Sequence, residues 1–185
     1  MIQDLGAYRT PPDWSPGAPL LLQLLWFSLG APLLANRWLP GSGWRVGLLR
    51  RFGARIGAGC RIKPGVRVKF PWRLVVGDHC WLGEAAWIDN LAVVTIGDRV
   101  CLSQGCFLCT GNHDFRSPGF ELRLGPICIE ADAWVAARAV LAPGTTIGRG
   151  AVVALGAVVH GQVPAGMITK GNPAVIVGPR SRRDS

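Results

Sequence analysis

The sequence predicts an all-β fold in which short parallel strands stack into a solenoid. Two observations lead to this class. From Ile56 onward an aliphatic residue recurs every six positions, which is the spacing of short extended segments joined by tight turns. The chain also has 25 Gly and 14 Pro among 185 residues, a share that is high for a helical bundle and suits a fold with many turns.

Residues 1–55 form an N-terminal extension before the repeat. Within it, residues 19–39 are the most apolar part of the chain, although a proline interrupts them. A membrane-spanning helix needs about 20 mostly apolar residues, so three readings stay open: a spanning helix, a helix packed on the protein's own core, or an interfacial helix with anchors. Next, Val46, Leu49 and Phe52 recur at helical spacing. The interfacial anchors would be Trp26, Trp38, Trp44, Arg45, Arg50 and Arg51.

The repeat covers residues 56–164. Each repeat is expected to turn one large aliphatic side chain inward and to use Gly, where present, for the positive φ of the turn. Three segments and three turns make a triangular coil, so fifteen inward positions make about five coils, each buried against the next. The positions are Ile56, Ile62, Val68, Val76, Leu82, Ile88, Ile96, Leu102, Leu108, Ile129, Val135, Leu141, Ile147, Val153 and Val159.

Three breaks in the period locate the candidate site. The spacing rises twice to eight and then to twenty-one, where a long loop spans residues 109–128. Each break follows the third segment of a coil, so all three excursions leave from one corner of the triangle. Asp89 and Asn90 are therefore expected one coil away from the long loop. A solenoid has little interior space, so its chemistry is expected where the regularity is broken.

The long loop carries the candidate base. The chain has three His, and His79 and His160 fall at turn positions, where exposed polar residues are expected. His113 lies in the loop beside Asp114. A neutral imidazole can accept a proton near neutral pH, so His113 is the candidate general base, and a solvated surface histidine is the other reading. Asp114 is a candidate to orient the ring or stabilise its charged form.

The repeat resembles the hexapeptide-repeat proteins, whose fold is a left-handed parallel β-helix. The loop TGNHDFRSP is similar to the active-site loop of hexapeptide acyltransferases. The stretches WIDNLAVVTIGDRVCLSQGCFLCTGNHD and KGNPAVIVG, with the apolar N-terminal segment, resemble the branch that acetylates colanic acid and other exopolysaccharides. The resemblance covers nearly the whole chain and implies acetyl-CoA-dependent O-acetylation of a sugar, with His113 as base and direct attack on the thioester.

The resemblance also implies roles for further residues and an assembly. Glu84, Asp89 and Asn90 would contact the sugar or glycan acceptor, and the protein would be a homotrimer with each site between two subunits. Where many relatives have Thr-Lys, this chain has His160-Gly161, so one phosphate contact is missing. Residues 165–185 form a C-terminal loop and basic tail, in which Arg180, Arg182 and Arg183 suit a solvated tail as well as a phosphate. The positions expected to meet coenzyme A are Trp134, Ala136, Ala137, Ala154, Gly156, Lys170, Asn172, Pro173 and Arg180.

The net charge and the cysteine content limit which binding partners and which cellular compartment are expected. Lys and Arg number 20 against 11 Asp and Glu, a net charge of +9, which suits a phosphate-bearing cofactor, an anionic membrane surface or nucleic acid. Dispersed arginines and the lack of a recognition helix argue against nucleic acid. The start MIQDLGAYRTPPDW shows no cleavable signal pattern. We therefore expect reduced cysteines and a cytoplasmic protein, with contact at the inner membrane face through residues 19–39 left open.

Two other functions, a zinc enzyme and a non-catalytic scaffold, fit the sequence less well than acetyl transfer. A zinc enzyme such as the γ-class carbonic anhydrases needs about three protein ligands, and the His nearest to His113 in sequence is His79, so no metal is expected. Cys106 and Cys109 form a lone C-x-x-C, but Cys106 occupies an inward position, which favours packing. The remaining alternative is a non-catalytic β-helix scaffold, which has no use for so long a loop.

Overall fold

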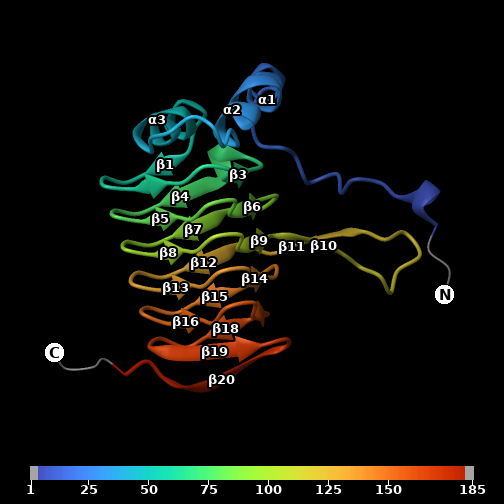
Figure 1. Cartoon of the computed structure of the whole chain (residues 1–185). Helices are drawn as coiled ribbons and strands as arrows, with labels where there is room; N and C mark the ends of the chain where they lie inside the picture. The colour runs from blue at the N-terminus through green and yellow to red at the C-terminus, as the bar shows by residue number, and fades with distance from the viewer. Residues whose placement is uncertain (1–3, 182–185) are drawn as a thin grey trace.

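The strands wind into a parallel β-helix with helices at one end and a hairpin at the other (Figure 1). This computed structural model describes residues 4–181. Three sheets form the faces of the helix, and each strand pairs in parallel with the strand one coil away, apart from the terminal β19–β20 hairpin. The predicted all-β solenoid is confirmed.

The three sheets are defined by their strands in spatial order. The first sheet contains β1 (Arg55–Ile56), β4 (Leu74–Val76), β7 (Val94–Ile96), β12 (Ile127–Ile129), β15 (Thr146–Ile147) and β18 (Gln162–Val163). The second contains β2 (Arg61–Ile62), β5 (Trp81–Leu82), β8 (Cys101–Leu102), β13 (Trp134–Val135), β16 (Val152–Val153), β19 (Met167–Gly171) and β20 (Ala174–Pro179). The third contains β3 (Arg67–Val68), β6 (Trp87–Asp89), β9 (Phe107–Cys109), β14 (Val140–Leu141) and β17 (Val158–Val159).

The core is the column of side chains that the period predicts. All fifteen predicted inward residues are buried. The predicted turn conformation is also present, because seven Gly residues within residues 56–164, Gly59 and Gly65 among them, have positive φ. Five turns place another residue in this left-handed conformation at the same point of the repeat, namely His79, Ala85, Arg99, Asp132 and Arg138.

The solenoid has about six coils, not the predicted five. The first and second sheets each contain a sixth parallel strand, β18 and β19. The prediction missed this coil because Val163 follows Val159 by only four residues, which breaks the period of six. Val163 nevertheless pairs with Ile147 of the coil before it.

A helical cap covers the first coil. It consists of α1 (Leu20–Leu25), η2 (Trp26–Gly30), α2 (Ala31–Leu34) and α3 (Gly43–Arg51). Trp26, Leu34 and Leu49 are fully buried, and the Trp26 indole donates to the Lys69 carbonyl over 2.9 Å. Residues 19–39 therefore pack on the protein's own core, which is one of the three predicted possibilities. Within residues 4–181, no helix has the length and apolar character needed to cross a membrane.

An N-terminal arm, residues 4–19, joins the cap to the long loop. It includes the short helix η1 (Leu5–Ala7) and runs from α1 to the loop tip (Figure 1). The Trp72 indole, in η3 (Pro71–Arg73), donates to the Pro16 carbonyl over 2.7 Å. At the far end the Asp4 amide donates to the Pro118 carbonyl over 3.0 Å.

The long loop is a two-stranded antiparallel ribbon. Its strands are β10 (Gly111–His113) and β11 (Leu122–Leu124), with His113 opposite Leu122. The ribbon projects from the middle of the solenoid, between β9 and β12 (Figure 1). It therefore leaves from the corner between the third and first sheets, which is the corner that the spacing predicts.

Candidate active site

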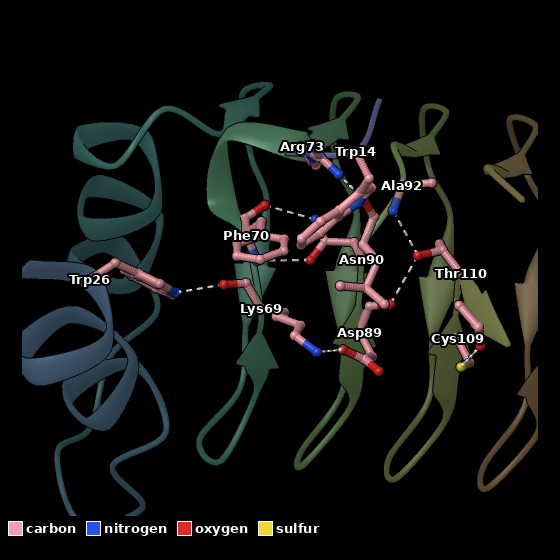
Figure 2. A network of polar contacts seen from close by, with 12 residues as sticks. Trp14, Trp26, Lys69, Phe70, Arg73, Asp89, Asn90, Ala92, Cys109 and Thr110 are labelled. Carbon is pink, nitrogen blue, oxygen red and sulfur yellow. Dashed lines mark hydrogen bonds and ion pairs between the residues drawn. The ribbon is translucent and has the colours of Figure 1, made fainter. Parts of the chain in front are cut away.

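The corner from which the ribbon projects is tied together across three coils (Figure 2). Asn90 is fully buried, and its amide both accepts from the Phe70 N–H (2.9 Å) and donates to the Phe70 carbonyl (2.7 Å). Thr110, also fully buried, accepts from the Ala92 N–H (2.9 Å) and donates to the Asp89 carbonyl (3.1 Å). Since buried polar groups with every partner in place make a corner rigid, the ribbon begins from a fixed point.

His113 is held at the ribbon by two aromatic rings and one carbonyl. Its Nδ1 lies 2.8 Å from the Phe120 carbonyl oxygen. A carbonyl can only accept, so Nδ1 carries the proton and Nε2 keeps its lone pair. The Phe120 ring stacks on the imidazole at 4.3 Å, and the Tyr8 ring of the arm meets it edge-on at 5.6 Å. This arrangement leaves His113 able to accept a proton at Nε2.

Phe120 supplies its carbonyl from an unusual backbone conformation. Its φ is +50°, in the left-handed region that non-glycine residues rarely occupy. Five turns of the repeat share this conformation, so it is the contact of the Phe120 carbonyl with His113, and not the conformation alone, that marks this site. The sequence pattern gave no sign of Phe120 or Tyr8, because neither lies in the repeat and Tyr8 is distant from the loop along the chain.

Asp114 does not take the orienting role that the sequence suggested. Its carboxylate accepts from the Arg123 guanidinium over 2.8 Å and from the Arg116 N–H over 3.0 Å. These donors hold the pKa of the Asp114 carboxyl below its usual value. Asp114 therefore fastens the two strands of the ribbon, and the Phe120 carbonyl is the group that orients His113.

Asp89 and Asn90 differ in what they can reach. The Asp89 carboxylate lies 3.1 Å from Lys69 Nζ on the preceding coil, and its side chain keeps some exposure. Asn90 has none, and both ends of its amide are engaged by Phe70. Asn90 therefore binds the backbone of Phe70, and its side chain is not exposed to an acceptor in this chain.

A groove runs along the second sheet at its corner with the third. Four of the residues expected to meet coenzyme A share a hollow of about 400 Å³, and the next hollow, of about 470 Å³, contains Glu84. Ser103 and Gln104 line both hollows, and the Trp134 indole donates to the Ser103 hydroxyl over 2.9 Å. The first hollow is lined by Ser103, Gln104, Trp134, Ala136, Ala137, Val152, Ala154 and Leu155.

The other residues expected to meet coenzyme A divide into two groups. Gly156 follows β16, Lys170 lies near the end of β19, and Asn172 and Pro173 form the turn after it. These residues lie toward the groove corner, because β19 pairs in parallel with β16. Arg180 instead lies at the corner between the first and second sheets. There it donates to the Asp132 and Gly150 carbonyls over 3.0 and 3.1 Å. Arg182 and Arg183 lie outside the described residues.

Within one chain the base and the groove occupy different corners. The His113 ribbon leaves between the third and first sheets, whereas Glu84, Ala137 and Ala154 lie between the second and third.

No group of three or more His, Cys, Asp or Glu among residues 4–181 could hold a metal ion. Cys106 is buried, and burial raises the pKa of its thiol to about 12.

A parallel β-helix with a histidine-bearing ribbon at one corner and a groove along a neighbouring sheet defines the hexapeptide-repeat acyltransferases. No protein-family model matches the sequence. The chain is 38% identical over 181 residues to the putative colanic acid biosynthesis acetyltransferase WcaF of Escherichia coli K12, covering 97% of this chain and 98% of the relative. The chain therefore belongs to the hexapeptide-repeat acetyltransferase family, as predicted, and is an acetyltransferase and not a scaffold.

Solved structures agree with this assignment. A hexapeptide-repeat acetyltransferase from Vibrio cholerae, in complex with acetyl coenzyme A, aligns with a TM-score of 0.78 and 27% identity over 90% of this chain and 92% of that one. A galactoside acetyltransferase in complex with coenzyme A aligns with a TM-score of 0.78 and 22% identity, over 96% and 89% of the two chains, and shares the fold. The predicted left-handed β-helix is confirmed.

Proposed function

We propose that the protein transfers an acetyl group from acetyl-CoA to a sugar hydroxyl during exopolysaccharide synthesis, with His113 as general base. The observation that carries the proposal is the contact between His113 Nδ1 and the Phe120 carbonyl (2.8 Å), which leaves Nε2 free to accept a proton. The names of the relatives support the acetyl donor and the polysaccharide context. The six free cysteines suit a cytoplasmic enzyme.

The reaction is a direct transfer between two bound substrates. The acceptor hydroxyl gives its proton to His113 Nε2 while its oxygen attacks the thioester carbonyl carbon. A backbone N–H near the ribbon stabilises the oxyanion of the tetrahedral intermediate. The intermediate then expels the coenzyme A thiolate, which takes the proton back from His113. The Phe120 carbonyl stabilises the imidazolium that exists between these two steps.

Coenzyme A is proposed to lie in the groove of the second sheet. Its pantetheine arm would pass Trp134 and the backbone around Ala137 and Ala154, which line the 400 Å³ hollow. Its nucleotide end would meet Lys170, near the end of β19, and the turn at Asn172 and Pro173, because β19 lies beside β16 at the end of the groove. Arg180 would not contact coenzyme A in this groove, because its guanidinium donates to carbonyls at another corner.

We further propose a homotrimer in which the ribbon of one subunit reaches the groove of the next. The separation of His113 from Ala137 and Glu84 within one chain supports this, because the thioester and the base must meet. Glu84 and Asp89 would then contact the acceptor from two subunits. Mixing His113→Ala with the groove-blocking variant Ala137→Trp should restore part of the activity, since some sites would combine two intact halves. Activity that stays at zero in mixed oligomers would rule out the shared site.

Acceptor-dependent release of coenzyme A tests the reaction itself. Free thiol is measured with acetyl-CoA and a panel of free, nucleotide-linked and lipid-linked sugars, and the acetylated product is identified by mass spectrometry. We expect release that requires one acceptor and a product heavier by one acetyl group. Binding of acetyl-CoA without transfer to any member of a panel that includes the cell's own lipid-linked repeat unit would contradict the proposed acceptor class.

A further inference from the structure

The helical cap exposes large apolar side chains on the sides that it does not turn toward the first coil. Trp38 is 91% exposed and Leu29 is 63% exposed, whereas Trp26 and Leu34 of the same cap are fully buried. Single exposed leucines are ordinary on protein surfaces, but nine large apolar side chains exposed within residues 20–39 indicate a binding partner. We call this the cap surface, and its main members are Leu20, Leu21, Leu24, Leu29, Leu33 and Trp38.

The charge of the chain is concentrated at the same end. Residues 14–77 run from the end of the arm through the cap and the first coil to the first strand of the second coil. They contain ten Lys and Arg and not one Asp or Glu. The rest of the chain has ten basic and eleven acidic residues, so the net charge of +9 arises entirely from this end. Arg37 and Arg51 of the cap are exposed, and so are Arg55 and Arg61 on the first coil.

The combination of apolar and basic groups indicates which kind of partner would cover the cap surface. A second copy of the chain would match the apolar side chains, but two ends with no acidic residue would repel each other. A bilayer with anionic headgroups offers acyl chains to leucines and phosphates to arginines at the same time. The helix from Leu20 to Leu34 is also too short to span the bilayer, so it would lie in the interface.

We propose that this end of the molecule docks on an anionic phospholipid bilayer. Leu21, Leu24, Leu29 and Trp38 enter the interface between headgroups and acyl chains, and Arg37 and Arg51 meet lipid phosphates. The solenoid then stands away from the bilayer with its capped end down. If the proposed sugar transfer holds, the docked enzyme would meet glycans built on lipid carriers, but the docking itself does not depend on that reaction.

Flotation of the full chain with lipid vesicles tests the docking. One set of vesicles is phosphatidylcholine alone, and the other contains about one third phosphatidylglycerol. We expect binding to the anionic vesicles that weakens with added salt, and little binding to the neutral ones. Leu29→Gln should weaken binding about tenfold, because it removes one large apolar side chain from the buried surface. Arg51→Gln should weaken it about fivefold, as expected for one basic side chain near the surface.

Matched variants at other surfaces serve as controls. Ile176→Gln removes a 48% exposed apolar side chain at the opposite end of the solenoid, and Arg138→Gln removes an exposed arginine from the fourth coil. Both should bind vesicles like the wild type. Absence of binding to anionic vesicles, or equal loss in the control variants, would overturn the proposal. A smaller mass of Leu29→Gln in lipid-free solution would overturn it as well, because a second copy would then cover the cap surface.

Discussion

His113 and Phe120 lie face to face, with ring centroids 4.3 Å apart and planes only 3° from parallel, while the Phe120 carbonyl oxygen lies 2.8 Å from His113 Nδ1. One residue thus supplies both the surface on which the imidazole rests and the acceptor that fixes its tautomer. The left-handed backbone of Phe120, with φ of +50°, turns this carbonyl toward the ring. The position of the base therefore depends on the backbone of Phe120 as well as on its side chain.

Two substitutions of Phe120 separate these contributions. Phe120→Gly removes the ring but keeps the left-handed conformation accessible, whereas Phe120→Pro fixes φ near −65° and turns the carbonyl away. We expect kcat to fall more in the proline variant, by about 10- to 100-fold for a lost hydrogen bond to a charged group. The KM for acetyl-CoA should stay close to that of the wild type in both, because Phe120 is not one of the residues that line the groove. Equal kcat values would show that the carbonyl does not position His113.

Gly111 lies where the base of the ribbon passes close to Leu91. A Cβ on residue 111 would lie 2.5 Å from Leu91 Cδ1. The Leu91 methyl group ends a flexible, half-buried side chain that can move aside, so Gly111→Ala should lower stability by only about 1 kcal/mol, with a small fall in kcat. Leu91→Ala should recover much of both losses in the double variant, since it removes the obstructing methyl group. Independent, additive effects in urea unfolding would argue against this contact.

Asn90 and Asp89 should respond to substitution in opposite ways. Asn90→Ala leaves the buried N–H and carbonyl of Phe70 without their side-chain partner, which should lower the free energy of unfolding by about 2 kcal/mol. Asp89→Ala loses only a partly exposed ion pair with Lys69, so stability should change little while the acceptor KM rises. Denaturant titration and steady-state kinetics on both variants check this contrast. A raised acceptor KM with unchanged stability in Asn90→Ala would refute it.

The sequence predicted the regular part of the molecule far better than the site. All fifteen inward positions were correct because stacking fixes one large side chain per segment, and the shared corner of the breaks located the ribbon. The sixth coil was missed because the turn before Val163 is short. Asp114 and Arg180 meet partners that the sequence did not indicate, because position along the chain does not decide which partner a side chain meets. Tyr8 and Phe120 reach His113 through tertiary packing, which the six-residue repeat does not predict.

The buried thiols predict an alkaline loss of stability. Burial raises the pKa of Cys80 to about 11 and that of Cys106 to about 12, whereas an unfolded thiol titrates near 8.5. Both thiols thus contribute fully below about pH 8.5, and the unfolded state gains as pH rises from there toward the folded pKa values. Unfolding free energies measured at pH 8 and pH 10 should fall less in Cys106→Ala than in the wild type. An identical fall in the two proteins would show that Cys106 does not contribute.

The measurement that tests the central claim most directly is the rate of thiol release from acetyl-CoA, with the active acceptor, for the wild type and His113→Ala. Loss of general-base catalysis should lower kcat by about 10²–10⁴-fold, while the Kd for acetyl-CoA and the unfolding temperature stay close to those of the wild type. A correctly folded His113→Ala protein that releases thiol as fast as the wild type would contradict the assignment of His113 as the base.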